Sequence, residues 1–167
     1  MARRQPIGTP ATLALTRAGM EFSVHAYEHD VRADSYGREA ADVLGLDPAR
    51  VFKTLVADVD GSPVVAVVPV SGTLDLKALA AAAGGRKAEM ADPATAQRIT
   101  GYVVGGISPI GQKRSLPTFL DSTAIDHERI YVSGGRRGLD IGVTPSDLIA
   151  ITDAAFARIG RPDRTST

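Results

Sequence analysis

The chain has 167 residues, in which 19 basic side chains balance 19 acidic ones, and it contains no cysteine. A length of roughly 100–200 residues is typical of one domain, and the charge balance argues against a strongly basic, free nucleic-acid binder. The lack of cysteine excludes disulfides, Cys-ligated zinc, iron–sulfur clusters and a cysteine nucleophile. No apolar run approaches the roughly 18 residues of a membrane-spanning helix, and no hydrophobic segment follows the basic start as in a signal peptide. We therefore expect a soluble, cytoplasmic protein.

The first half of the chain mixes helix and strand signals. Capping residues and glycines mark helix ends, and alternating or valine-rich apolar runs mark strands. In chain order they predict a helix over 10–19, a strand over 22–27, a helix over 35–44, strands over 51–59 and 63–70, and a helix over 75–83. Asp60-Gly61 lies between the two valine-rich runs, so we expect a hairpin there.

The second half contains shorter elements. The signals predict a helix that starts at Asp92-Pro93, strands over 102–104, 118–120, 130–132 and 139–143, and a last helix from Thr144 to about Ile159. No regular βαβ rhythm appears, so the sequence predicts an α+β fold with a largely antiparallel or mixed sheet that closes on itself. We expect one domain over 9–160 and flexible, polar termini at 1–8 and 161–167.

His25, Glu28 and His29 match the H-x-x-E-H pattern of zinc proteases letter for letter. That chemistry requires both histidines on one face of a helix. The residues around them alternate as in a strand, so we interpret the match as a strand end on which His25 and Tyr27 share a face. We therefore predict no metal dependence.

Two glycine-rich stretches are candidate ligand loops. The stretch 106–113 approaches a Walker A loop, but Gln112 is inserted before the lysine, Arg114 replaces the Ser or Thr, and Pro109 removes a backbone donor. The stretch 133–138 does not match G-x-G-x-x-G. These departures argue against an NTPase. Each stretch is equally well interpreted as a loop that approaches a ligand closely or as a tight turn between strands.

Lys53 is the most informative single residue. In strand phase it shares a face with Val51, Leu55, Ala57 and Val59, which are all apolar. A lysine on an apolar face is desolvated unless it meets an anion or lines a cavity. The alternative is a side chain that extends from the strand end to solvent. We favour the pocket, because no carboxylate near in sequence shares this face.

Candidate nucleophiles are few. Ser108 and Ser133 lie in the glycine-rich stretches and Thr54 follows Lys53, and none of them has a histidine nearby in sequence. The nucleophile-elbow pattern G-x-S-x-G is absent. An enzyme built on this chain is therefore expected to act by positioning and polarisation rather than through a covalent nucleophile of its own.

Six segments stand out along the chain, in this order: 27–30 (YEHD), 51–55 (VFKTL), 89–97 (EMADPATAQ), 101–113 (GYVVGGISPIGQK), 116–118 (LPT) and 131–141 (YVSGGRRGLDI). Together they closely resemble the YbaK proteins, the freestanding Cys-tRNA(Pro) deacylases, whose superfamily includes the editing domain of bacterial prolyl-tRNA synthetase. The resemblance covers about residues 9–160. It implies a compact, barrel-like mixed sheet surrounded by helices, the clearing of mischarged tRNA, and no metal or other cofactor.

The resemblance also implies functional positions at Tyr27, Lys53, Gly105, Ser133 and Asp140, and physical arguments add further expected site residues. The expected catalytic residues are Lys53, Gly105 and Gly106, with the glycine N–H groups donating to a developing oxyanion and Lys53 holding a phosphate or polarising the carbonyl. The expected substrate-binding residues are Tyr27, Thr54, Ser108, Pro109, Ser133, Gly134 and Asp140. Lys113, Arg114, Arg136 and Arg137 are expected either to contact tRNA or to form an ordinary solvated rim.

In the family that the chain resembles, the thiol of the substrate attacks its own ester, which leaves a cyclic thiolactone and free tRNA. The resemblance thus implies a deacylase for Cys-tRNA(Pro), and for Cys-tRNA(Cys) as a further substrate, with prolyl-tRNA synthetase as the expected partner. Two alternatives stay open. One is an Ala-tRNA(Pro) deacylase that uses water or the ribose hydroxyl, and the other is a non-catalytic module that binds aminoacyl-tRNA or a synthetase.

Overall fold

The computed structural model of the chain describes residues 8–33 and 35–162. Its helices are α1 (Pro10–Arg17), α2 (Tyr36–Leu44), α3 (Leu76–Ala82), α4 (Pro93–Thr100), α5 (Pro145–Thr152) and the 3-10 helix η1 (Ser122–Asp126). Its strands are β1 (Ser23–Ala26), β2 (Phe52–Val59), β3 (Ser62–Pro69), β4 (Gly72–Leu74), β5 (Ala88–Met90), β6 (Thr118–Asp121), β7 (Ile130–Arg136), β8 (Leu139–Val143), β9 (Ala155–Ala157) and β10 (Gly160–Pro162).

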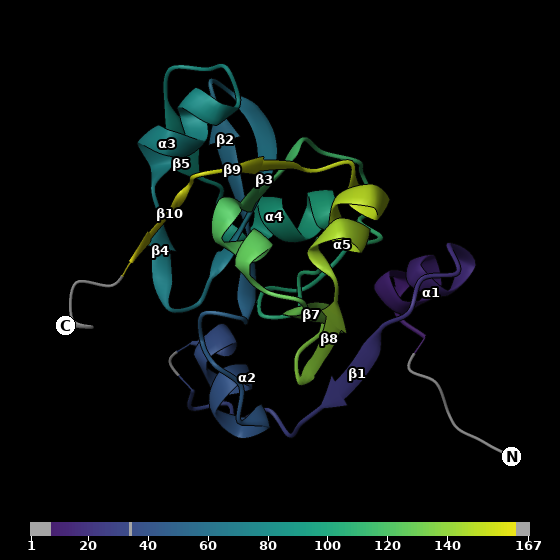
Figure 1. Cartoon of the computed structure of the whole chain (residues 1–167). Coiled ribbons are helices and arrows are strands. Elements are labelled where there is room, and N and C mark those ends of the chain that lie inside the picture. The colour runs from purple at the N-terminus through teal and green to yellow at the C-terminus, as the bar shows by residue number, and fades with distance from the viewer. Residues whose placement is uncertain (1–7, 34, 163–167) are drawn as a thin grey trace, which may run out of the picture.

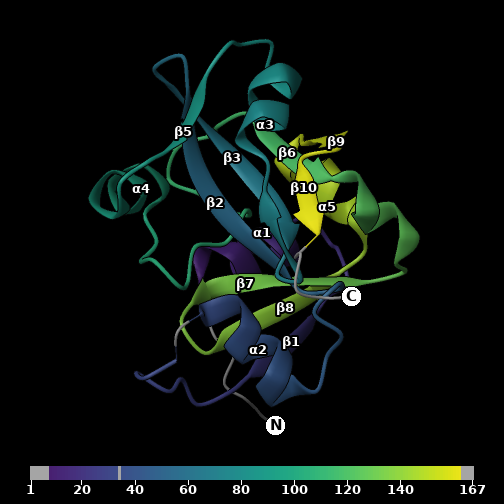
Figure 2. The same cartoon turned by 90° about the vertical axis from the view of Figure 1, so that its left-hand side faces the viewer.

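The strands form three sheets, around which the helices are distributed (Figures 1 and 2). The largest has the order β5-β2-β3-β6-β9, the second has the order β1-β8-β7, and β10 pairs with β4. β6 runs parallel to β3 and to β9, whereas the other named pairs are antiparallel. This arrangement confirms the predicted α+β fold with mixed sheets.

The two larger sheets meet at the start of β2. Val51 forms a parallel bridge with Tyr131, and the Tyr131 N–H donates to the Arg50 C=O at 2.9 Å. Helix α2 packs on this junction, because its Ala41 shares a buried cluster with Val51, Val70 and Tyr131. Figure 2 shows the long β2–β3 hairpin extending away from the β7–β8 pair at this point. The junction therefore brings segments that are distant in sequence to one place.

The β2–β3 hairpin has the turn that its sequence predicts. Asp60 and Gly61 both have left-handed backbone conformations, with φ of 51° and 87°, as a two-residue type I′ turn requires. This turn fixes the register in which Phe52 opposes Pro69. The hairpin prediction is confirmed, and the register sets which β2 side chains face each side of the sheet.

The first half of β2 has a free edge. β3 pairs along the whole of β2, whereas β5 pairs only with its last three residues, 57–59. The Ala91 N–H donates to the Val56 C=O across this edge at 3.1 Å. Because the backbone groups of alternate residues in a strand point the same way, the N–H and C=O of Thr54 are directed to that edge too.

The buried core lies on both sides of the central hairpin. One cluster joins Leu15 of α1, Val67 of β3, Ile141 of β8 and Leu148 of α5, all nearly or fully inaccessible. A second cluster packs Leu79 of α3 against the opposite side of the hairpin, where Ala66 and Val68 are fully buried. The alternation of β3 between the two clusters explains its continuous valine run, since both of its faces are covered.

The predicted helix starts are confirmed. Each of the five α-helices begins after a side chain that accepts a hydrogen bond from the first turn, namely Thr9, Ser35, Asp75, Asp92 and Thr144. Gly45 ends α2 in the left-handed conformation, with φ of 67°. These local signals act within one turn of helix, which is why the sequence reveals them.

Some predicted boundaries are wrong. The segment 102–104 is a turn rather than a strand, and α5 ends at Thr152 rather than near Ile159. Asp153 adopts a left-handed conformation there, and the chain continues as β9 and β10, whose pairing with distant strands overrides the local alanine-rich pattern. Arg161 and Pro162 lie in β10, so the flexible tail that we predicted from 161 does not include them. The limits of 9–160 for one domain stay a prediction, and residues 1–7 and 163–167 lie outside the described residues.

None of the helices within 8–33 and 35–162 is both long enough and apolar enough to cross a membrane.

Candidate functional site

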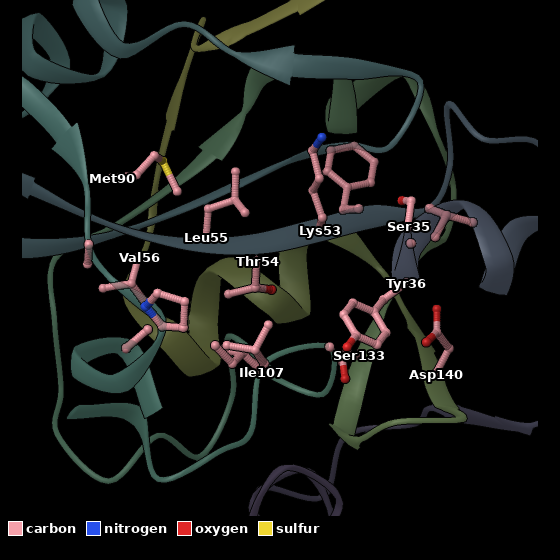
Figure 3. A pocket seen from close by; sticks show the side chains of 18 of the residues that line it. Ser35, Tyr36, Lys53, Thr54, Leu55, Val56, Met90, Ile107, Ser133 and Asp140 are labelled. Atoms are coloured by element: carbon pink, nitrogen blue, oxygen red, sulfur yellow. The ribbon is translucent and has the colours of Figure 1, made fainter. Parts of the chain in front are cut away.

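A cavity of about 360 Å³ opens where the free edge of β2, the start of α2, the loop 101–117 and the β7–β8 pair converge (Figure 3). A volume of roughly 300–1,000 Å³ is typical of sites for small organic groups. Six of the predicted site residues line it, namely Tyr27, Lys53, Thr54, Gly105, Ser133 and Asp140. These residues come from five separate segments, so the fold brings together what the sequence separates.

Lys53 and Thr54 leave β2 on opposite sides. Figure 3 shows Lys53 and Leu55 on one side of the strand, and Thr54 on the side that faces Ile107. The Lys53 Nζ donates to the Gly72 C=O of β4 at 3.0 Å. The predicted strand phase of Lys53 is therefore confirmed, and the lysine lines the cavity with its ammonium held at a defined place.

Thr54 presents an unusual hydroxyl. Its Oγ1 is inaccessible to solvent and makes no hydrogen bond within the described part of the chain. A buried hydroxyl without a partner destabilises the fold by about 1–3 kcal/mol. Thr54 lines the cavity beside the free backbone edge of β2, but its hydroxyl oxygen is closed off from solvent there.

Asp140 supplies a buried carboxylate to the cavity. It is opposite Ser133 on β7 and His25 on β1, so these side chains share one face of the three-stranded sheet. Burial raises the pKa of Asp140 to about 7. A carboxyl group with this pKa is half ionised near neutral pH, and a bound cation stabilises its charged form.

Tyr27 contributes a hydroxyl that stays protonated. Burial, followed by the nearby charges of Asp140 and Glu39, raises the pKa of Tyr27 to about 12. The Tyr27 N–H donates to the Gly138 C=O at 2.8 Å, which anchors the segment at the β7–β8 turn. At neutral pH this phenol is therefore a hydrogen-bond donor and not a base.

The loop that carries Gly105 approaches α2 closely. Gly105 has φ of 90°, and a Cβ at this position would lie 2.6 Å from ring carbons of Tyr36, so only glycine fits. The Gly105 N–H makes no hydrogen bond within residues 8–33 and 35–162, which leaves it available to a ligand. The Gly106 N–H, by contrast, donates to the Val103 C=O at 2.8 Å. Our expectation that Gly106 donates to an oxyanion is therefore wrong, because its donor closes the turn.

Three expected binding residues do not line the cavity. Ser108 is fully buried, and its Oγ accepts from the Ile110 N–H at 3.2 Å. Pro109 is buried beside it. The Gly134 C=O accepts from the Thr9 hydroxyl at 2.6 Å, which ties β7 to α1. Ser108, Pro109 and Gly134 therefore shape the loop and strand behind the site, and the prediction of direct substrate contact is not supported.

The four basic side chains expected at the rim are all exposed and lie outside the cavity. Lys113 packs against Gly101, and the backbone of Arg136 packs against Gly106, so both lie along the loop that carries Gly105. The Arg137 Nε donates to the Val104 C=O at 2.8 Å, and its guanidinium lies over the Tyr36 ring. Arg137 thus lies outside the cavity but contacts two residues that line it, Val104 and Tyr36.

The H-x-x-E-H match lies in strand context, as predicted. His25 belongs to β1, bonds the Ser23 hydroxyl at 2.8 Å and packs edge-on against Tyr131. His29 lies beyond the strand and bonds the buried Glu39 of α2 at 2.7 Å. Across 8–33 and 35–162, no three His, Asp or Glu side chains are grouped as metal ligands.

Several residues that line the cavity were not predicted from the sequence. Tyr36 and Gly37 come from the first turn of α2, Met90 from β5, and Ile107 from the glycine-rich loop. Met90 falls within the 89–97 segment that carries part of the family resemblance, so that segment contained a signal. For Tyr36 no local signal exists, because its role depends on the approach of Gly105 from far along the chain.

Comparison with known proteins agrees with this fold. A family model described as an aminoacyl-tRNA editing domain matches residues 32–151. The chain is also 42% identical over 135 residues to EbsC of Enterococcus faecalis, which is named as a Cys-tRNA(Pro)/Cys-tRNA(Cys) deacylase, and the match covers 80% of this chain and 82% of EbsC. The chain therefore belongs to the aminoacyl-tRNA editing domain family.

Two further similarities fit this assignment. A proline–tRNA ligase of Maridesulfovibrio salexigens is 31% identical over 104 residues, which are 60% of this chain and 17% of the ligase. The crystal structure of a protein described as a trans-editing enzyme for prolyl tRNA synthetase superposes with a TM-score of 0.78 and 24% identity, covering 93% of this chain and 99% of that one. The latter match shows that the two proteins share a fold.

Proposed function

We propose that this protein is a trans-editing deacylase that removes cysteine from mischarged tRNA(Pro), with Cys-tRNA(Cys) as a further substrate. The observation that carries the proposal is the chemical content of the cavity. It offers Lys53, the Gly105 N–H and Asp140, which stabilise charge, but none of the three histidines lines it to activate a serine or threonine. The name of the 42% identical EbsC supports the same substrate.

Asp140 is the proposed partner of the substrate's α-ammonium group. Burial makes the lone charge of Asp140 unfavourable and raises its pKa to about 7, and a bound cation stabilises such a carboxylate. An aminoacyl ester carries such a cation next to its carbonyl. Binding through Asp140 would therefore also orient the ester toward the Gly105 loop.

Gly105 and Lys53 are the proposed stabilisers of the ester carbonyl. The Gly105 N–H is unused by the protein within its described residues, and preorganised donors of this kind contribute about 2.7–4 kcal/mol to oxyanion stabilisation. Lys53 lines the cavity, and the bond from its Nζ to the Gly72 C=O fixes the position of the ammonium. We propose that it polarises the carbonyl or holds the terminal phosphate.

The proposed reaction uses the thiol of the substrate. The thiol sulfur forms a bond to its own carbonyl carbon, the bond from this carbon to the ribose oxygen breaks, and the thiol proton passes to the leaving oxygen. The products are a cyclic thiolactone and free tRNA. Holding the two reacting groups together supplies up to roughly 7–11 kcal/mol through proximity, so the protein needs no nucleophile of its own.

We also propose prolyl-tRNA synthetase as the partner. A pocket sized for proline discriminates by only a few kcal/mol against an amino acid as small as cysteine, so a second site must clear the error. The similarity of this chain to a segment of a proline–tRNA ligase supports a functional connection between the two.

One observation favours a second candidate, a deacylase for Ala-tRNA(Pro). Asp140, with a pKa of about 7, has the properties of a general base for water, and its strand neighbour Ser133 lines the same cavity. In that case a water molecule, not the substrate, attacks the ester.

Purified protein assayed on Cys-, Ser- and Ala-charged tRNA(Pro) distinguishes these functions. Thiol attack predicts rapid release from Cys-tRNA(Pro) and almost none from Ser-tRNA(Pro), although the two side chains are close in size, since a hydroxyl is a far poorer nucleophile at neutral pH. Efficient clearance of the serine or alanine ester would move the assignment to a water-based hydrolase. Binding of all three without release would indicate a non-catalytic module.

A further inference from the structure

Arg137 makes two contacts to the cavity wall from the turn between β7 and β8. Its Nε donates to the Val104 C=O at 2.8 Å, directly before Gly105, and its guanidinium carbon lies 5.2 Å from the centre of the Tyr36 ring. Each contact fixes a segment that reaches the site: the loop that carries Gly105 and the first turn of α2. These two segments also press on each other, because Gly105 has no room for a Cβ beside Tyr36.

The same turn holds a third part of the site. Gly138, the next residue, accepts from the Tyr27 N–H at 2.8 Å and has φ of 81°, with its α-carbon turned toward the Tyr27 backbone. Tyr27, Tyr36 and Gly105 all line the cavity, and they come from three segments without a common sheet. The Arg137-Gly138 turn is the element that contacts all three segments.

We infer that Arg137 is a positioning residue for the deacylation site, and not a contact to tRNA phosphate. The inference rests on the proposed function, since it assumes that Gly105 and the residues around it hold the ester. By tying the Val104 carbonyl and the Tyr36 ring to one guanidinium, Arg137 sets the distance between the Gly105 N–H and the groups on the opposite wall. Displacements of about 1 Å at such a site reduce the rate about 100-fold.

The chemistry of the two contacts requires arginine. The planar guanidinium donates from Nε at its edge while its face stacks on an aromatic ring, whereas a lysine ammonium is a point donor without a face. A phosphate contact does not require arginine, because lysine and arginine both neutralise one phosphate. Arg137→Lys therefore separates the two roles within one substitution.

The experiment compares Arg137→Lys with Arg136→Gln in the full chain. For each variant, kcat and KM on Cys-tRNA(Pro) are measured at several salt concentrations. The rate at which the Gly106 amide hydrogen exchanges with solvent is measured without substrate, because this N–H closes the turn to Val103. We expect Arg137→Lys to lower kcat about 10- to 100-fold, to accelerate Gly106 exchange and to leave the salt slope unchanged. Arg136→Gln, the adjacent exposed arginine, should raise KM and reduce the salt slope by about 1.

Two results would overturn the inference. One is an Arg137→Lys protein with wild-type kcat and unchanged Gly106 exchange. The other is an Arg137→Gln protein that keeps kcat but loses about 1 from the salt slope, which identifies a phosphate contact.

Rescue of Arg137→Ala by millimolar guanidinium ion is a second result that we expect, and it separates positioning from a general loss of folding. If the wild-type protein proves inactive, the proposed function fails, whereas the Gly106 exchange rate still tests whether Arg137 holds the loop.

Discussion

Burial sets the chemical properties of the cavity residue by residue. Asp140 and Tyr27 both have raised pKa values, but with opposite consequences, because one becomes titratable near pH 7 and the other stays a neutral donor. Thr54 keeps a buried hydroxyl without a partner in the described residues. The lone buried charge of Asp140 and the hydroxyl of Thr54 are unfavourable for the folded protein alone, which is typical of residues arranged for a ligand, whereas the neutral phenol of Tyr27 has no such cost near pH 7.

We expect Lys53→Ala to lower the deacylation rate about 100-fold or more while the protein stays folded. Lys53 lines the cavity and its Nζ is fixed by a bond to the Gly72 C=O, so the substitution removes a placed charge from the site. Truncation also relieves desolvation of the lysine, so the free energy of unfolding should fall by no more than about 1 kcal/mol. Rates and urea unfolding, with exposed Lys77→Ala of α3 as the control, test this. Wild-type turnover, or outright unfolding, would contradict the assignment of Lys53.

Above about pH 7, Asp140→Asn should both stabilise the protein and inactivate it. Burial raises the pKa of Asp140 from the usual 3.8 to about 7, so the folded state binds this proton more tightly than the unfolded state does. Wild-type stability should therefore decrease as pH rises from about 4 to about 7. Above pH 7 the variant should be more stable by on the order of 4 kcal/mol, and below pH 4 the difference should vanish.

The measurement is thermal or urea unfolding of both proteins between pH 4 and pH 8, with Asp126→Asn on the exposed η1 segment as the control. The wild-type KM should decrease as pH rises through about 7, since the ionised carboxylate binds the substrate ammonium. A stability difference that is the same at every pH would show that Asp140 does not titrate as described.

The elements show where sequence patterns suffice and where they do not. The helix caps and the Asp60-Gly61 turn depend on neighbours within a few residues, and all of them were predicted. The strands β4, β5, β9 and β10 have three residues each and exist because of pairing partners far along the chain, so no local pattern marks them.

The same distinction holds for the site. The predicted position of Lys53 came from strand alternation, which the sequence shows directly. The available donor at Gly105 and the occupied one at Gly106 differ only in a turn hydrogen bond to Val103. That difference depends on the folded loop, which is why residues such as Gly106 and Ser108 were expected in contact with substrate.

Gly72 of β4 links strand β10 to the site. A Cβ on Gly72 would lie 2.3 Å from the Arg161 backbone oxygen, so Gly72→Ala should force β10 away from β4 and displace the carbonyl that holds the Lys53 Nζ. We expect a loss of roughly 1–3 kcal/mol of stability and a lower kcat. The exchange rate of the Asp75 N–H, which donates to the Ile159 C=O, reports the separation.

Thr73→Ala, one residue along β4 with an exposed side chain, is the matched control and should leave the Asp75 exchange rate near that of the wild type. A Gly72→Ala protein with native exchange and kcat would show that β10 does not position the lysine.

For the whole molecule, the balance of 19 basic and 19 acidic residues limits how strongly it binds nucleic acid. The three exposed residues Lys113, Arg114 and Arg136 belong to the loop 101–117 and to the end of β7. A small, local patch attracts an acceptor end without holding a whole tRNA tightly. Selectivity among tRNAs is then expected to come from a partner such as the synthetase.

A small basic patch predicts that kcat/KM depends only weakly on salt concentration. Three phosphate contacts with about 0.7–0.9 counterions released at each give a slope of roughly −2 to −3 for log(kcat/KM) against log salt. Neutralising the three rim residues together, as Lys113→Gln, Arg114→Gln and Arg136→Gln, should bring the slope close to zero through KM. Because the cavity groups are untouched, kcat at saturating Cys-tRNA(Pro) should stay within about two-fold of the wild type, a margin that surface substitutions usually respect. A wild-type slope steeper than about −5 would require phosphate contacts elsewhere on the surface, and a loss of kcat in the triple variant would place one of these side chains in the reaction itself.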